Sequence, residues 1–298
     1  MMWLRLLRVL PAGALAAMAT VAFANCGSIP FVAGAQVYRP YQRAVAAFDG
    51  REQVLLLSTD LRADRHTKVL EVLTFPSKPI VSQGDEELFQ KAAQLIDDRL
   101  AERQAGRRAP GRIGTGGRIP NGSAAFHERI QVQGTSVVQI PDSQSFIAWV
   151  HDYLRKAGVD EPEIPLRLRS LVRDCVRDGF TWFVFNVIEV GPETAARPTL
   201  QYRFATHKLY YPLRIMGTES GNTTIRLVLV SPRLVIMPDI RPRRAVLLHH
   251  PITVSRDDLS YLGGGLTDFF DRSPQQLRLW EIKGPLNSLR RDVLTDWF

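Results

Sequence analysis

The chain has 298 residues, 45% of them hydrophobic, and carries a formal net charge of +8. This length and composition suffice for one large domain or two small ones with a hydrophobic core. A basic chain can attract nucleic acid, but the first residues, described next, predict export, and an exported protein is not expected to bind nucleic acid.

The first 24 residues have the pattern of a secretory signal peptide. Arg5 and Arg8 form a positive start, residues 9–23 carry no charge, and residues 22–24 read Ala-Phe-Ala. The pattern predicts export and cleavage before Asn25. The apolar run is shorter than the roughly 20 residues of a membrane span. An uncleaved anchor is the alternative interpretation.

Cleavage would leave 274 residues with a net charge of +6, because Arg5 and Arg8 are the only charged residues removed. Part of the remaining excess is local: a span of twenty residues holds Arg99, Arg103, Arg107, Arg108, Arg112 and Arg118. A phosphate-bearing envelope component or an anionic membrane face would attract such a chain. We expect membrane contact to be peripheral at most after cleavage. A solvated linker is the simpler interpretation of the arginine-rich span.

Two cysteines, Cys26 and Cys175, remain in the predicted mature chain. In an oxidising compartment an even number of cysteines favours a disulfide, here between the mature terminus and a helix. Alternatively, Cys175 fills the apolar face of its helix as a small hydrophobic residue.

In chain order, residues 44–48 and 53–57 are apolar runs joined by Asp49-Gly50, a strong hairpin signal. Residues 68–75 predict a strand that ends at Pro76. Residues 85–103 predict a helix, with acids at its start and arginines at its end. Residues 106–122 are rich in glycine, proline and arginine, and predict a flexible linker. Strand alternation resumes over 127–140.

The stretch from Asp142 to Met237 is the most strongly patterned. Asp142 can cap a first helix that Gly158 ends, and a second helix closes at Gly179. The apolar positions of these helices are Phe146, Trp149, Val150, Tyr153, Leu154, Leu168, Leu171, Val172, Cys175 and Val176. Residues 180–190 then predict a strand covered on both faces, with Trp182 in the core.

Further strands are predicted at 200–204, 209–215 and 224–230. The order of elements indicates an α+β fold with largely antiparallel sheet. We expect five parts: a signal peptide (1–24), an N-terminal α+β part (25–105), the linker (106–122), an α+β core (123–240), and a C-terminal extension packing on that core (241–298).

Several pieces occur in the order of a known family. They are Cys26 after the leader, Thr74-Phe-Pro-Ser-Lys-Pro79, an acidic helix, the helix from Asp142 to Gly158, Gly179-Phe-Thr-Trp-Phe-Val184 and Tyr211-Pro-Leu-Arg-Ile215. Over residues 25–235 the chain resembles a family of secreted bacterial proteins known only as domain of unknown function 2330. The resemblance implies export and a shared fold, and it supplies no reaction.

Motifs for catalysis and metal binding are absent from the sequence. His249 and His250 are adjacent, so on a strand they would point to opposite faces, although Asp257 and Asp258 follow closely. No metal-binding spacing, serine nucleophile elbow or phosphate-binding glycine loop occurs. Pairing of Cys175 with His151 or His207 is disfavoured, because an apolar helix face raises a thiol pKa. We therefore predict no catalytic residue, metal or cofactor.

One aromatic group could bind a ligand. Tyr210 and Tyr211 beside Arg214 could line a groove for a carbohydrate or peptide. Cross-strand packing is the favoured alternative for these tyrosines. The resulting hypothesis is an exported, non-catalytic protein that binds an unidentified envelope component, for which an anionic molecule is the candidate. The alternative is an envelope hydrolase whose site is assembled from dispersed residues.

Overall fold

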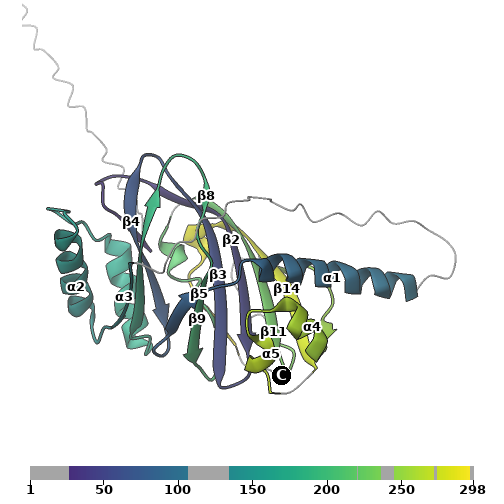
Figure 1. Ribbon diagram of the computed structural model, residues 1–298. Helices are drawn as coiled ribbons and strands as arrows, with labels where there is room; N and C mark the ends of the chain where they lie inside the picture. Colours follow the sequence, from purple (N-terminus) through teal and green to yellow (C-terminus); the bar gives the residue numbers. More distant parts are fainter. Residues whose placement is uncertain (1–26, 107–133, 220, 236–244, 272–273, 296–298) are drawn as a thin grey trace, which may run out of the picture.

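Two large β-sheets lie face to face in the computed structural model, with helices on their outer faces (Figure 1), and a third sheet consists of two short strands. The structure describes residues 27–106, 134–219, 221–235, 245–271 and 274–295. Helices α2 and α3 flank one side, and α1, α4 and α5 flank the other. The predicted α+β class with largely antiparallel sheet is confirmed.

The elements follow one another along the whole described chain. The helices are α1 (Glu87–Gly106), α2 (Ser143–Lys156), α3 (Leu166–Arg177), α4 (Arg256–Leu262), α5 (Leu266–Phe269) and the short 3-10 turns η1 (Met216–Thr218) and η2 (Leu286–Ser288). The strands are β1 (Ser28–Pro30), β2 (Val37–Phe48), β3 (Glu52–Ala63), β4 (Thr67–Phe75), β5 (Ile80–Gln83), β6 (Thr135–Gln139), β7 (Trp182–Val190), β8 (Ala195–Ala196), β9 (Leu200–Ala205), β10 (Leu209–Tyr211), β11 (Asn222–Ser231), β12 (Ala245–Leu247), β13 (Ile252–Val254), β14 (Gln275–Pro285) and β15 (Val293–Thr295).

The larger sheet has nine strands, seven of them in the order β12-β14-β11-β2-β3-β9-β5. β13 pairs with β14, and β8 pairs with β3. The β2–β3 hairpin turns at Asp49-Gly50 as predicted, with Gly50 at φ 104°. β11 runs parallel to β2, whereas its other neighbour β14 is antiparallel. Residues 241–298 thus supply β14, an inner strand between β12 and β11.

The smaller sheet has the order β1-β4-β7-β6 and packs under α2 and α3. Phe183 and Phe185 of β7 contact Phe146 of α2 at ring-centroid distances of 5.5 and 5.9 Å. Asn186 points to the opposite face, where it contacts Glu71 of β4. β7 is therefore covered on both faces, as predicted. The core placement of Trp182 is wrong: this ring is only half-buried, with the Lys78 ammonium 5.7 Å from its centre.

Side-chain alternation along β2 divides the core into layers. Ala44, Ala46 and Phe48 belong to the apolar cluster that lies between the sheets and continues to α2 and α3. Val45 and Ala47 belong to a second cluster, under α1, α4 and α5. Successive residues of a strand point to opposite faces, so one strand can supply both clusters.

The predicted C-terminal ends of α2 and α3 hold, whereas α1 runs from Glu87 to Gly106 instead of over 85–103. The Asp142 side chain accepts a hydrogen bond from the backbone N–H of Ser145 and caps α2. Gly158 and Gly179 take the positive φ expected after a helix, at 86° and 89°. No helix of the described chain is long and apolar enough to cross a membrane. The predicted signal peptide, Cys26 and nearly all of the predicted linker (residues 107–122) lie outside the described residues.

Candidate functional site

The structure separates the three residues predicted to form a ligand groove. Tyr210 and Tyr211 of β10 are both fully buried. The Tyr210 hydroxyl donates to the Thr74 carbonyl oxygen at 2.9 Å, and the Tyr211 hydroxyl donates to Gln42 Oε1. Burial raises the pKa of both phenols. The two rings therefore lie in the core instead of lining an open groove, and only Arg214 reaches the surface.

Arg214 is held in place by two carboxylates and a ring. Its Nη1 lies 2.6 Å from Asp178 Oδ2, and its Nε lies 3.1 Å from Asp292 Oδ2. The guanidinium carbon lies 5.6 Å from the centre of the Phe180 ring. The hydrogen bond from Arg214 lowers the pKa of Asp178, whereas burial raises the pKa of Asp292 despite the same guanidinium. Arg214 is thus a positioned charge with its own counter-ions.

A surface hollow of about 860 Å³ lies beside Arg214. We call it the arginine depression; its lining is Leu166, Arg167, Ser170, Leu171, Asp174, Arg214, Gly217, Thr218, Asn287, Ser288, Leu289 and Arg290. Arg167 and Arg290 are exposed and form no ion pair with any residue that the structure describes. Asp174 is paired with Arg177, whose Nη1 lies 3.2 Å from its Oδ1. The depression therefore has two cations free to meet an external anion.

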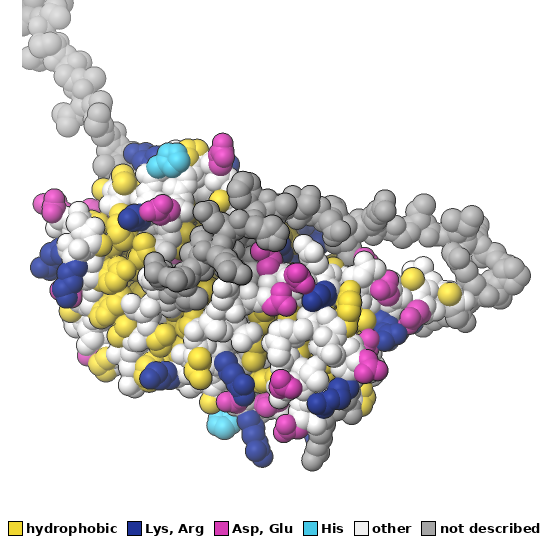
Figure 2. Space-filling model, in the orientation of Figure 1, with side chains coloured by type: hydrophobic (Ala, Val, Ile, Leu, Met, Phe, Trp, Pro, Cys, Tyr) yellow, Lys and Arg dark blue, Asp and Glu magenta, His cyan; other side chains and the backbone are white. Residues whose placement is uncertain are grey.

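Close packing of η1 on η2 forms the base of the depression. A Cβ at Gly217 would collide with the carbonyl oxygen of Leu289, so only glycine allows this approach. The backbone N–H of Leu286 donates to the Gly221 carbonyl oxygen at 2.8 Å, which fixes the start of η2. These contacts bring Arg290 close to the start of α3. On the face drawn in Figure 2, basic, acidic and apolar side chains all reach the surface at the end that carries α2 and α3.

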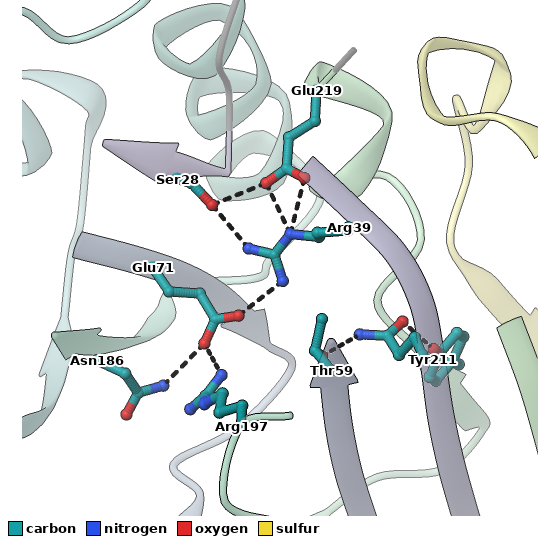
Figure 3. A network of polar contacts seen from close by, with 9 residues as sticks. Ser28, Arg39, Thr59, Glu71, Asn186, Arg197, Tyr211 and Glu219 are labelled. Atoms are coloured by element: carbon teal, nitrogen blue, oxygen red, sulfur yellow. Dashed lines mark hydrogen bonds and ion pairs between the residues drawn. The ribbon is translucent and has the colours of Figure 1, made fainter. Parts of the chain in front are cut away.

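A second group of charges is closed to solvent. The buried ionic cluster consists of Arg39, Glu71, Arg197 and Glu219, all at most 7% exposed (Figure 3). Arg39 Nη1 lies 2.8 Å from Glu71 Oε1, and Arg39 Nε lies 2.7 Å from Glu219 Oε2. Arg197 Nη1 contacts the other Glu71 oxygen. Two guanidinium groups thus face two carboxylates, and the formal charges cancel.

A β-bulge aims Arg39 into this cluster. Between Tyr38 and Tyr41, β2 has one residue more than the facing part of β3. The extra residue reverses the alternation of β2, so Arg39 points between the sheets like Gln42 and Ala44. Ser28 of β1 completes the cluster, because its hydroxyl donates to Glu219 Oε1 at 2.9 Å and accepts from Arg39 Nη2 at 2.7 Å.

Burial dominates the electrostatics of the cluster. It raises the pKa of Glu219 although Arg39 opposes the shift, and it lowers the pKa of Arg197. Neutralising only a carboxylate or only a guanidinium group of the cluster would leave a buried charge without its partner. The cluster joins β1, β2 and β4 to the end of η1, so its role is to hold the two sheets together rather than to meet a substrate.

The histidine candidates lie apart from both features, whereas Cys175 is buried on α3 within electrostatic reach of Arg214. His249 is 9% exposed, and its Nδ1 lies 2.6 Å from the His250 carbonyl oxygen. Asp258 caps α4 and pairs with Arg99 instead of meeting either histidine. Within the described residues, no group of three or more His, Cys, Asp or Glu could hold a metal ion. Burial raises the pKa of the Cys175 thiol to about 12. The disulfide with Cys26 stays a prediction.

Comparisons with known proteins identify no family for this chain. No protein-family model matches the chain, and no curated protein matches it. The resemblance to domain of unknown function 2330 therefore stays a prediction. Among solved structures, baculovirus P35 is similar with a TM-score of 0.42 and 10% sequence identity, over 91% of this chain and 99% of that one.

Proposed function

We propose that this protein is exported and binds a phosphate-bearing, anionic component of the cell envelope, without catalysis, through the arginine depression. The observation that carries the proposal is the pair of exposed arginines, Arg167 and Arg290, that both line the hollow. The predicted leader supports the compartment. A guanidinium can donate two parallel hydrogen bonds to a phosphate, which favours arginine at such sites.

An apolar side chain accompanies these charges. Leu166, the first residue of α3, is 77% exposed and also lines the depression. An exposed leucine beside arginines suits peripheral contact with an anionic lipid surface, where the charge meets headgroups and the leucine meets acyl chains. Each arginine near such a surface contributes about 1 kcal/mol, so the pair contributes about 2 kcal/mol, or roughly 30-fold in affinity.

The alternative of an envelope hydrolase lacks a comparable observation. Two pairs of carboxylates converge: Glu71 and Glu219 are 0% and 1% exposed in the buried ionic cluster, and Asp178 and Asp292 are both paired with Arg214. A hydrolase needs a general acid or base within hydrogen-bonding reach of its substrate. We therefore develop only the binding proposal.

Vesicle binding tests the proposal. The mature protein is titrated with phosphatidylcholine vesicles that do or do not contain phosphatidylglycerol. We expect binding only to the anionic vesicles, and a loss of roughly 30-fold in the double variant Arg167→Gln/Arg290→Gln. The control is Arg155→Gln/Arg256→Gln, which removes two exposed arginines elsewhere and should bind within about twofold of the wild type. Equal losses in both variants, or no binding by the wild type, would contradict the proposal.

Export is tested separately. We expect the protein recovered from the exported fraction to begin at Asn25, because residues 22–24 read Ala-Phe-Ala. Mass spectrometry of the intact protein measures this. A mass that includes residues 1–24, or a lipid on Cys26, would contradict the predicted processing.

A further inference from the structure

The outer face of the nine-stranded sheet is only partly covered by helices. Val45, Leu56 and Val228 of this face belong to the apolar cluster under α1, α4 and α5. Two residues further along each strand, the same face carries Arg43, Ser58 and Arg226, which lie opposite one another in register. The next row holds Thr224, Tyr41 and Asp60. The sheet therefore continues beyond the helices as a polar surface.

We call this surface the polar strip and define it by Tyr41, Arg43, Asp60, Thr224, Arg226 and Glu281. All six side chains are partly exposed. Tyr41 stands in the middle, between Thr224 on β11 and Asp60 on β3. At its edge, the exposed Arg62 lies over the ring of Tyr38, with its guanidinium carbon 5.0 Å from the ring centre. The strip thus combines aromatic faces with groups that donate and accept hydrogen bonds.

The charged side chains of the strip do not use all of their hydrogen-bonding groups on one another. Arg43 Nε and Arg226 Nε have no hydrogen-bond partner, although both atoms are shielded from solvent. Lys283 Nζ lies 2.7 Å from Glu281 Oε1, but the other contacts between charges are loose: Arg43 Nη2 lies 4.0 Å from Asp60 Oδ1 and 3.5 Å from Glu86 Oε1, and Arg226 Nε lies 3.5 Å from Glu281 Oε2. Well-formed charged hydrogen bonds are shorter, at about 2.7–2.9 Å. A ligand hydroxyl could bridge either pair.

The balance of charge indicates the class of ligand. Three cations (Arg43, Arg226 and Lys283) face three carboxylates (Asp60, Glu86 and Glu281), so a strongly charged ligand would meet one repulsive partner for each attractive one. A sugar hydroxyl donates to a carboxylate and accepts from a guanidinium, which suits both kinds of group. The apolar face of a sugar ring can lie on a tyrosine, as in ligand sites that combine aromatic faces with a few polar groups. We propose that the polar strip binds a neutral oligosaccharide.

The size of the strip agrees with such a ligand. Adjacent strands are about 4.8 Å apart, so the four strands β14, β11, β2 and β3 span about 14 Å, room for roughly three hexose rings. This site is separate from the arginine depression, which involves α3, η1 and η2. Loss of ligand binding at the polar strip therefore does not affect binding at the arginine depression, and the two proposals can fail independently.

The test uses a printed array of neutral oligosaccharides of glucose, mannose, galactose and N-acetylglucosamine. The mature wild-type protein should bind at least one series, and Tyr41→Ala and Asp60→Asn should each weaken that binding about tenfold or more, since they remove a stacking face and an acceptor. Tyr261→Ala is the matched control, because Tyr261 is a 48% exposed tyrosine on α4. Arg167→Gln/Arg290→Gln should keep wild-type array binding.

Three results would overturn the proposal. One is that the wild type binds no oligosaccharide on the array. A second is that Tyr41→Ala and Tyr261→Ala have equal effects. The third concerns the alternative occupant, a second copy of the chain: a dimer in sedimentation velocity that Tyr41→Ala dissociates would assign the strip to self-association. Urea denaturation of each variant shows that a loss of binding is not a loss of folding.

Discussion

Replacing Glu71 with glutamine probes the buried ionic cluster directly. Glu71 is fully buried and accepts from Arg39, Arg197 and Asn186. Glutamine keeps its shape but removes the negative charge, so Arg197 would lose the carboxylate that pairs with it and Arg39 would keep Glu219 alone. Removing one partner of a buried ion pair costs about 3–5 kcal/mol. We expect Glu71→Gln to lose this amount, a large fraction of the roughly 5–15 kcal/mol by which a domain is stable.

Urea denaturation of wild type and variants measures the loss. The control is Glu52→Gln, since Glu52 pairs with Arg203 at 2.6 Å at the surface and should contribute at most about 1 kcal/mol. A second variant, Glu71→Gln/Arg197→Met, restores neutrality because only Arg39 and Glu219 remain charged. It should be more stable than Glu71→Gln alone by about 1 kcal/mol or more. A loss below about 1 kcal/mol in Glu71→Gln, or additive losses in the double variant, would refute the reasoning.

Three further predictions concern other parts of the fold. Trp182→Ala should lower the free energy of unfolding by about 1–3 kcal/mol and Phe185→Ala by about 3–5 kcal/mol, because only the phenylalanine is fully buried; equal losses in urea denaturation would contradict this. Burial alone would raise the pKa of Asp258, but hydrogen bonds from Ser255 and Arg99 outweigh it and hold the pKa below its ordinary value. Its stabilisation is therefore complete above the unfolded pKa of about 3.9 and is lost as the pH falls through the folded value. Asp258→Asn should cost about 1–3 kcal/mol at pH 7 and progressively less in acid, and a difference that does not shrink would contradict the assignment. In a Cys26→Ser variant, Cys175 should resist iodoacetamide at pH 8.5 until the protein unfolds, because burial raises the pKa of its thiol to about 12; rapid labelling of the folded protein would show an open site.

Local signals in the sequence were enough for the first three helices and the first hairpin, but α4 and α5 were not predicted. The carboxylate of Asp142, the spacing from Phe146 to Leu154 and the glycine at 158 act within a few residues of one another. Asp49-Gly50 likewise fixes its hairpin without help from the rest of the chain. These elements match the prediction because their causes are local.

The pairing of distant strands could not be predicted in this way. β11 joins β2 in parallel, and β14 joins β11 from the C-terminal part of the chain. From the sequence, Tyr210 and Tyr211 could line a groove or, as favoured, pack within the sheet; they are buried because β10 packs against the β2–β3 hairpin. A strand only three residues long carries too little alternation to indicate that both of its faces are covered.

The charged residues of the buried ionic cluster and of the arginine depression are far apart in the sequence, so their proximity could not be predicted. Glu71 sits within the apolar run 68–75, an unusual place for a carboxylate and the one signal that a buried partner exists. Its partners Arg39 and Arg197 lie 32 and 126 positions away. Arg167 and Arg290, which both line the depression, are likewise brought together only by the packing of α3 near η1 and η2. Only the folded chain reveals such groups.

Hydrogen–deuterium exchange in the presence of phosphatidylglycerol vesicles tests the proposed binding site most directly. We expect slower exchange of backbone amide hydrogens at the start of α3, residues 166–174, and at residues 286–290, with no change at α4 (Arg256–Leu262). Protection confined to other elements, or exchange unchanged by the vesicles, would contradict the assignment of the arginine depression as the site that meets an anionic envelope surface.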